Sequence, residues 1–306
     1  MKKATKVWLI VAGALVIAGL VMAGGALARE RLKAAAEASP ISAVEKESVA
    51  VEGTFEHIVI RSIGSVLIFP SDDDQCHLEF IAGDRDKYTA EVQDGTLTII
   101  QKAVLKKKKW YEYIRFRISE EEQPGVTVYL PEKVYRTLTA NSEYGDVFGH
   151  EAFAFENVDI ATDTGNVYGP FSASGMLKIK TDTGDIFLDS LSAGDVDLHV
   201  GTGDVKMTDV TCKRLHSEGS TGDMKLIGVI ASDSIDIQRS TGDIRFDGCD
   251  ARTLNVKTST GDVTGSLSSG KTFIAQSDTG RIDVPATTGG ICRITTSTGD
   301  IRITVE

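Results

Sequence analysis

Acidic side chains recur at a fixed interval through the second half of the sequence, each directly after a glycine. The aspartates of these Gly-Asp steps are Asp146, Asp185, Asp204, Asp223, Asp243, Asp262 and Asp300. Three further carboxylates, Asp163, Asp182 and Asp278, stand two residues before the repeated glycine. Calcium prefers about six to eight oxygen ligands of this kind. If neighbouring copies lie close in space, the calcium candidates are Asp163, Asp182, Asp185 and Asp204.

Two observations favour a structural role for these aspartates instead. Most positions two residues before the glycine hold Ser or Gly, and the glycine-rich nonapeptide of calcium-binding solenoids is absent. An aspartate beside a glycine can accept backbone N–H bonds within its own turn. We therefore expect turn capping, with no metal and no cofactor, and keep calcium binding as the alternative.

A threonine stands directly before almost every repeated glycine. The set is Thr164, Thr183, Thr202, Thr221, Thr241, Thr260, Thr279 and Thr298. Threonine rows on a flat solenoid can bind ice or sugars when they face outward. Here the threonines share the parity of the apolar residues before them, and buried residues of a strand share one parity. The sequence therefore predicts a threonine-lined inner corner.

The histidines form no recognisable catalytic constellation. His57, His77, His150, His199 and His216 occupy different phases of the repeat, and the sequence has no serine-nucleophile motif or phosphate loop. The repeats carry almost no insertions, so they leave little cleft to hold a substrate. We expect a protein that is not an enzyme. The alternative is a β-helix enzyme that acts on polysaccharides.

The glycines that precede these groups determine the expected architecture. They recur every 19 or 20 residues, at Gly145, Gly165, Gly184, Gly203, Gly222, Gly242, Gly261, Gly280 and Gly299. A period of this length indicates one supersecondary unit stacked on itself. We expect each glycine at a turn that needs a positive φ, a conformation that strains other residues.

Apolar residues alternate with polar ones on both sides of each glycine. In one unit they are Leu177 and Ile179 before the glycine, and Ile186 and Leu188 after it. Alternation of this kind is typical of strands with one buried face. The sequence predicts an all-β, single-stranded β-solenoid (β-helix) of about nine 19–20-residue coils over residues 139–306. Shorter alternating runs over residues 49–138 predict an irregular β cap or first coils.

The N-terminus carries a membrane signal. Residues 7–28 form a stretch of 22 residues without a charge, preceded by three lysines. That length is sufficient to cross a bilayer as a helix. The two hypotheses are a retained single-pass transmembrane anchor and a signal peptide cleaved near Ala28. The length favours the anchor, with residues 29–48 as a linker and the following domain on the extracytoplasmic side of the cell membrane.

Charge and cysteine content narrow the possible partners. Residues 139–306 carry 25 acidic and 14 basic residues, and an acidic surface disfavours nucleic acid. Lys106–Ile118 joins four lysines to aromatic residues, which fits either contact with an anionic surface or a solvated loop. Cys212 and Cys249 read as small core residues or free thiols, because four scattered cysteines make no disulfide framework.

The steps "TDTGDI", "TSTGDV" and "STGDIR", at this spacing and after a membrane segment, resemble a bacterial β-strand-repeat family of unknown function often labelled "putative adhesin". The similarity covers roughly residues 51–306. It implies a β-solenoid that is often membrane-tethered, and it brings no catalytic residue. Asn166 and Arg281 depart from the acidic pattern, which weakens any scheme that requires an acid in every coil.

These observations predict a membrane-tethered, extracytoplasmic β-solenoid that acts as a non-catalytic, adhesin-like binding or scaffold module at the cell envelope. Its partner would be an unknown envelope protein or polysaccharide. The sequence ends at "IRITVE" with no visible cap. Unpaired strand edges invite pairing with another chain, so self-association through the C-terminal coil is also possible.

Overall fold

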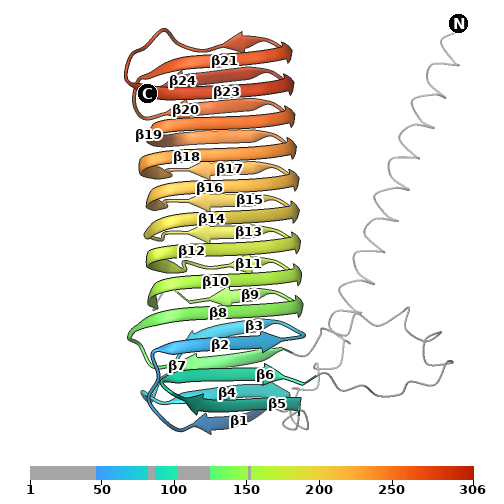
Figure 1. Cartoon of the computed structure of the whole chain (residues 1–306), viewed down its shortest axis with the longest axis vertical. Coiled ribbons are helices and arrows are strands. Elements are labelled where there is room, and N and C mark those ends of the chain that lie inside the picture. Colours follow the sequence, from blue (N-terminus) through green and yellow to red (C-terminus); the bar gives the residue numbers. More distant parts are fainter. Residues whose placement is uncertain (1–45, 82–86, 103–124, 151–152) are drawn as a thin grey trace, which may run out of the picture. The chain divides into compact units, whose positions relative to one another are not determined.

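The computed structural model describes residues 46–81, 87–102, 125–150 and 153–306, and Figure 1 shows their arrangement. Residues 46–306 form one compact unit, and the described part of it consists of strands joined by turns. None of the described residues forms a helix that is long and apolar enough to cross a membrane. The predicted anchor at residues 7–28 and the Lys106–Ile118 segment lie outside the described residues.

Two faces build the solenoid, one from long strands and one from short strands. The long-strand face contains β2 (His57–Ser62), β5 (Tyr88–Gln93), β6 (Thr96–Gln101), β8 (Val134–Tyr144), β10 (Ala154–Thr164), β12 (Ser172–Thr183), β14 (Ala193–Thr202), β16 (Thr211–Thr221), β18 (Ile230–Thr241), β21 (Lys271–Thr279) and β23 (Gly290–Thr298). The short-strand face contains β1 (Lys46–Val51), β3 (Val66–Pro70), β4 (Cys76–Ile81), β7 (Val126–Leu130), β9 (Val147–Gly149), β11 (Val167–Tyr168), β13 (Ile186–Asp189), β15 (Val205–Thr208), β17 (Met224–Ile227), β20 (Val263–Leu267), β22 (Ile282–Asp283) and β24 (Ile301–Val305). The strand β19 (Ile244–Thr260) continues from the short-strand face into the long-strand face.

Apolar side chains of both faces meet inside the coils. Leu177 pairs in parallel register with Val196 on the long-strand face, and Ile186 pairs with Val205 on the short-strand face. All four side chains are buried, because a parallel register places equivalent residues of successive coils above one another. One continuous core results. The prediction of an all-β solenoid is confirmed, and residues 49–138 share the core of the repeats.

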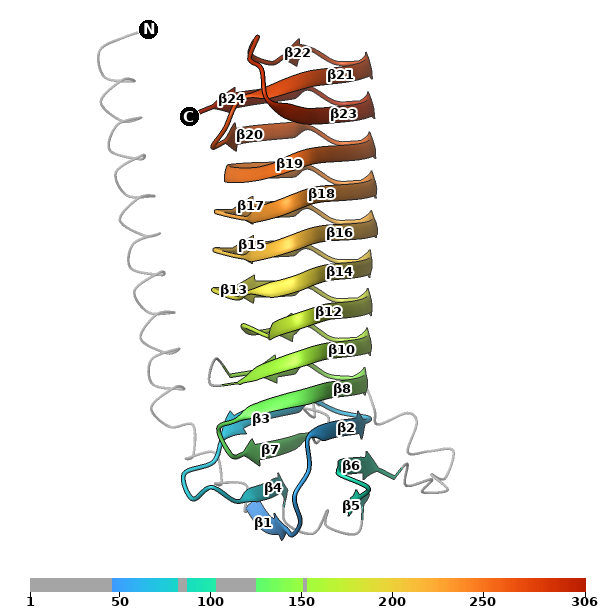
Figure 2. The ribbon, with the colours of Figure 1, turned by 60° about the vertical axis from the view of Figure 1, so that its left-hand side comes forward.

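The coils do not stack in sequence order at the C-terminal end. Strand β23 lies between β19 and β21, since Ile294 pairs with Val256 on one edge and with Ala275 on the other. Strand β24 likewise lies between β20 and β22. Figure 2 shows β21 and β22 beyond β23. The expectation of an open edge on the last coil is therefore wrong: within the described residues, the unpaired edge belongs to β21.

The N-terminal end repeats this arrangement. Strand β2 lies between β6 and β8, because Ile58 pairs with both Leu97 and Leu138. Strand β3 is inserted in the same way between β7 and β9. Antiparallel strands then finish the column: β5 pairs with β6, β4 pairs with β7, and β1 pairs with β4. Near each end of the solenoid a coil is thus inserted out of sequence order: β2 and β3 near the N-terminal end, and β23 and β24 near the C-terminal end.

Two cationic side chains lie in the interior. The ammonium of Lys271, at the start of β21, pairs with Asp250 and with Ser269 Oγ. Burial favours the neutral form of Asp250, but the hydrogen bonds from Lys271 and Ser269 and the charge of Lys271 outweigh it. The pKa of Asp250 is therefore lowered. The pair attaches the outermost coil to the coil that contains Asp250.

Arg239 is the unusual cation, because its side chain is 2% exposed and faces no carboxylate within hydrogen-bond distance. Its Nη2 donates to Ser217 Oγ at 3.2 Å, whereas Nε and Nη1 have no partner among the described residues. Burial lowers the pKa of Arg239. The guanidinium fits only because Gly219 has no side chain: a Cβ there would stand 1.6 Å from Nη1.

The cysteines follow the prediction made for Cys212 and Cys249. All four, including Cys76 and Cys292, are buried and free. Burial raises the pKa of Cys76 and Cys292 to about 12 and that of Cys212 to about 11. Because the thiolate is the reactive form, these thiols are inert in the folded protein.

The inserted C-terminal coil can be tested by truncation. A chain that ends at Gly289 lacks β23 and β24, so β21 loses its partner strand. We expect the amides of residues 271–283 to lose their protection in hydrogen–deuterium exchange, while residues 154–241 keep theirs. The full chain is the control. Retained protection over 271–283 would mean that these residues stack directly on β19 and β20.

The Arg239–Gly219 pair can be tested by a double-mutant cycle. Gly219→Thr alone should destabilise the protein, because its side chain would collide with the guanidinium. In the Arg239→Thr background the same change should be neutral or stabilising, since other coils bury a threonine at the equivalent position, as at Thr181 and Thr258. We expect a coupling free energy of about 1–3 kcal/mol from urea denaturation. Additive effects would contradict the described packing.

Candidate functional site

The repeated glycines and the residues on either side of them form one edge of the solenoid, which we call the Thr-Gly-Asp edge. Eight of the nine glycines have φ between 130° and 159°, and Gly145 is the exception. Stacking restricts them as strongly as φ does: a Cβ on Gly203 would stand 2.0 Å from the carbonyl oxygen of Gly184. Only glycine allows successive turns to approach this closely.

The aspartates of the edge bind the next coil rather than their own turn. Asp185 Oδ1 accepts a hydrogen bond from the backbone N–H of Asp204 at 2.7 Å, and Asp204 Oδ1 accepts one from Asp223 at 2.8 Å. The same bond links Asp223 to Asp243, Asp243 to Asp262 and Asp262 to Asp300. The predicted capping within a turn is therefore wrong. Each carboxylate satisfies an N–H that no strand reaches, and this offsets the repulsion between stacked charges.

The two departures from the acidic pattern fit this ladder. Asn166 keeps an acceptor, since its Oδ1 accepts the N–H of Asp185 at 2.8 Å. Arg281 has no acceptor, but its coil is the outermost one, so no further N–H follows it. Its own N–H bonds to Asp300 Oδ1 at 2.8 Å. That bond, the contact with Arg302 and the charges of Arg281 and Arg302 lower the pKa of Asp300 against a smaller effect of desolvation.

The threonines before the glycines face solvent. All eight are exposed, and they pair in register from coil to coil, as Thr202 does with Thr183 and Thr221. None of their hydroxyls has a hydrogen bond to another described residue. The prediction of a threonine-lined inner corner is wrong for this row. A threonine-lined inner corner is instead found at the position three residues before the glycine. There the buried Thr181 and Thr296 donate to the glycine carbonyls of neighbouring coils.

The four calcium candidates do not form a common group of ligands in the described structure. Asp163 and Asp182 lie exposed two residues before their glycines, whereas the Oδ1 atoms of Asp185 and Asp204 already accept N–H bonds. The described residues contain no group of three or more His, Cys, Asp or Glu side chains that could hold a metal ion. Calcium binding by these four aspartates stays the untested alternative.

A cluster on the outer side of the long-strand face escaped the sequence analysis. Glu218 Oε1 lies 3.3 Å from His216 Nε2, and Glu218 Oε2 lies 3.7 Å from His199 Nδ1. Asp197 Oδ1 lies 3.1 Å from His199 Nε2, but the angle is too poor for a hydrogen bond. The expectation that the histidines form no cluster is wrong for this pair. They belong to adjacent coils at positions offset by two residues, which makes them diagonal neighbours.

A shallow hollow of about 330 Å³ adjoins this cluster. Gly201, Lys180, Asp182 and Gln238 stand around it. Imidazole and carboxylate groups can exchange protons or bind a polar ligand. The described part of the hollow offers no serine hydroxyl hydrogen-bonded to a histidine, so it lacks a nucleophile–base pair.

The repeats also decide which family the sequence belongs to. The profile of the Toastrack DUF4097 family matches residues 55–228 and again residues 214–306. The chain belongs to the Toastrack family. Its two matches overlap, as expected when equivalent coils can be aligned in more than one register. A search of the curated proteins found no match.

Two solved structures are similar to this chain at low sequence identity. A "putative lipid binding protein" from Parabacteroides distasonis has a TM-score of 0.52 and 16% identity, with 85% of this chain and 97% of that chain covered. A "putative adhesin" from Bacteroides fragilis has a TM-score of 0.49 and 16% identity, with the same coverage. The first similarity supports the fold and nothing further.

The aspartate ladder makes a testable prediction at Asp262, whose Oδ1 accepts the N–H of Asp300 at 2.7 Å. Asp262→Ala removes the acceptor and should lower the free energy of unfolding by about 1–2 kcal/mol. Asp262→Asn retains an acceptor, as Asn166 does, and should cost less than half as much. Urea denaturation of both variants measures the difference. Equal losses would show that the carboxylate does not stabilise the stack through this bond.

Proposed function

We propose that the protein is a non-catalytic, adhesin-like binding module of the cell envelope, and that the Thr-Gly-Asp edge is its binding surface. The observation that carries this proposal is the row of eight exposed threonine hydroxyls, none bonded to another described residue. Asp185, Asp204, Asp223 and Asp243 each use only Oδ1 in the ladder. Their Oδ2 atoms add a parallel row of acceptors.

The spacing of these groups suggests an extended partner. Equivalent residues of stacked strands repeat at about 4.8 Å. A linear polymer lying along the edge would therefore meet one hydroxyl and one carboxylate oxygen in each coil from Gly184 to Gly261. Carbohydrate hydroxyls can donate to the carboxylates and accept from the threonines. We propose an envelope polysaccharide as the partner, and an envelope protein segment would need to be similarly extended.

The location of the module is part of the proposal. The uncharged residues 7–28 support a single-pass anchor in the cell membrane, with the solenoid on the extracytoplasmic side. Cleavage near Ala28 would instead release it. Self-association also remains a proposal, now through the free edge of β21. Ile274 and Ile282 of this coil are 50% and 45% exposed, which favours burial against another surface.

The alternative function is a β-helix enzyme that acts on polysaccharides. The cluster of Asp197, His199, His216 and Glu218 beside its hollow is the place on the described surface that favours it. An enzyme depends on one coil or two, whereas a multivalent binder uses many coils equally. The two functions therefore differ in how activity responds to substitutions made coil by coil.

The proposed edge can be tested with threonine-to-valine variants, which keep shape and strand propensity but remove the hydroxyl. We would replace Thr202, Thr221 and Thr241 singly and together, and measure co-sedimentation with insoluble peptidoglycan and with other envelope polysaccharides. Each change should weaken binding about two- to fivefold, and the triple variant should lose far more.

The matched control replaces three outward threonines elsewhere on the long-strand face, Thr139, Thr253 and Thr295. These variants should bind like the unaltered protein. The proposal fails if both triple variants bind equally well. Turnover of a polysaccharide that disappears with Glu218→Gln but survives the edge variants would establish the enzyme instead.

A further inference from the structure

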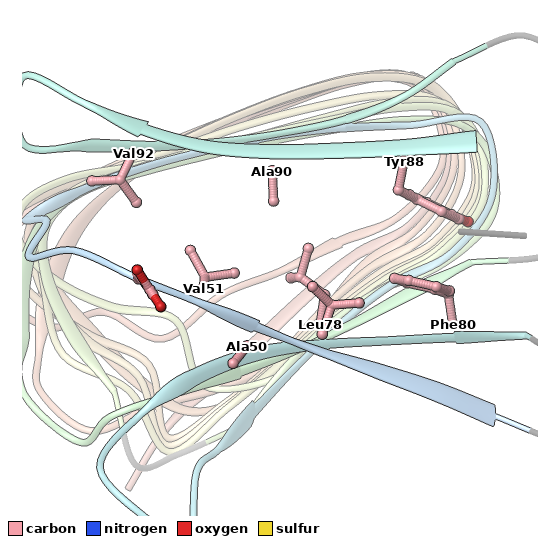
Figure 3. A pocket seen from close by; sticks show the side chains of 9 residues that line it. Ala50, Val51, Leu78, Phe80, Tyr88, Ala90 and Val92 are labelled. Carbon is pink, nitrogen blue, oxygen red and sulfur yellow. The ribbon is translucent and has the colours of Figure 1, made fainter. Parts of the chain in front are cut away.

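The N-terminal end of the solenoid opens into a hollow between its two faces. The long-strand face ends in β5 and the short-strand face ends in β1, and each pairs only with its neighbour in the same face. Among the described residues, no strand joins β5 to β1, and a space lies between them. Its volume is about 180 Å³, and Figure 3 shows its lining.

Apolar side chains from both faces point into this hollow. Val51, Leu78 and Phe80 approach from the short-strand face, and Tyr88, Ala90 and Val92 approach from β5 (Figure 3). Leu78, Phe80 and Tyr88 are buried, whereas Val51 and Val92 are half-buried and Ala90 is exposed. Burial thus divides the hollow into a closed part and an open part.

The closed part has aromatic walls. The rings of Phe80 and Tyr88 stack with centroids 5.2 Å apart, and the Tyr88 hydroxyl donates to the carbonyl of Gly125 at 3.1 Å. Among the described residues of the lining, only Glu52 is charged. A peptide inserted here would leave backbone N–H groups without acceptors, which is costly away from water. A hydrocarbon chain has no such groups.

Size also favours a hydrocarbon. An apolar cavity of about 150 Å³ binds benzene in another protein. The hollow is therefore large enough for the end of one acyl chain and too narrow for a helix, which is about 10 Å across.

We propose that this hollow binds the end of an acyl chain from a membrane lipid. The inference rests on the tether in the proposed function, because residues 7–28 lie at the same end of the sequence as β1. Seventeen residues separate Ala28 from Lys46, and a chain of that length spans at most about 60 Å. A tether at residues 7–28 would therefore join the solenoid at β1, the strand that borders the hollow.

The test uses residues 46–306, which form a compact unit with their own core, and a fluorescent long-chain fatty acid, cis-parinaric acid. The unaltered domain should bind it saturably, with unlabelled lauric acid competing. Ala90→Phe fills the hollow from an exposed position that tolerates a larger residue, and it should weaken binding about tenfold or more.

Thr89→Phe is the matched control. It adds the same ring to the adjacent exposed residue, which points to the opposite side of β5. It should bind the fatty acid like the unaltered domain. The proposal is overturned if the unaltered domain shows no saturable binding, or if both variants bind equally tightly.

These outcomes are separate from those of the proposed function. The fatty-acid assay contains no membrane and no polysaccharide, so loss of binding there leaves the Thr-Gly-Asp edge untouched. Membrane fractionation of the full chain tests the tether, and soluble full-length protein would contradict the tether without affecting the assay. Ala90→Phe should also leave polysaccharide co-sedimentation unchanged.

Discussion

The close stacking of glycine turns is the constraint on which the rest of the structure depends. A Cβ on Gly222 would stand 2.0 Å from the carbonyl oxygen of Gly203, and the other stacked turns are equally tight. At this separation the N–H after each glycine faces the coil that precedes it in the stack, where only a side chain can accept it. Aspartate provides that acceptor at the shortest reach. The Gly-Asp step is therefore one structural unit: glycine permits the approach, and aspartate satisfies the amide that the approach leaves unpaired.

The same stacking makes the ends of the column a difficulty, because an uncovered coil exposes a row of unpaired backbone groups. The protein inserts a coil from near each end of the sequence between two other coils, so that the inserted coil has no exposed edge. Strand β23 is paired on both edges, and so is β2. Antiparallel strands cover the N-terminal end, whereas the buried pair of Lys271 with Asp250 attaches the outermost C-terminal coil. At each end, the inserted coil therefore pairs with at least one coil that is not its neighbour in sequence order. The stability of these paired coils is consequently linked within that end of the column.

The sequence was sufficient to predict the relations within one coil, and it failed for relations between coils. The period located the glycines, and alternation identified buried residues such as Leu177 and Ile186. The partner of each aspartate, the contact of His199 with His216 and the order of the last coils depend on which coil lies above which. Equivalent coils are interchangeable by composition, so the period alone cannot order them. Arg281 was the available signal, because a coil without an acceptor is best tolerated at the end of the ladder.

The outward direction of the threonine row was missed because the alternation of buried and exposed residues breaks at the end of the strand, where in most coils the last two residues before the glycine are both exposed. This row is also the part of the repeat that folding explains least. Glycine, aspartate and the buried hydroxyl each have a structural partner, but the threonine before the glycine has none. Strand propensity alone does not account for its uniformity, since outward positions such as His199, Glu218 and Gln238 differ from coil to coil on the same strands. A uniform row of hydroxyls that bond to no other described residue, beside variable outward positions, is the observation on which the proposed binding surface rests.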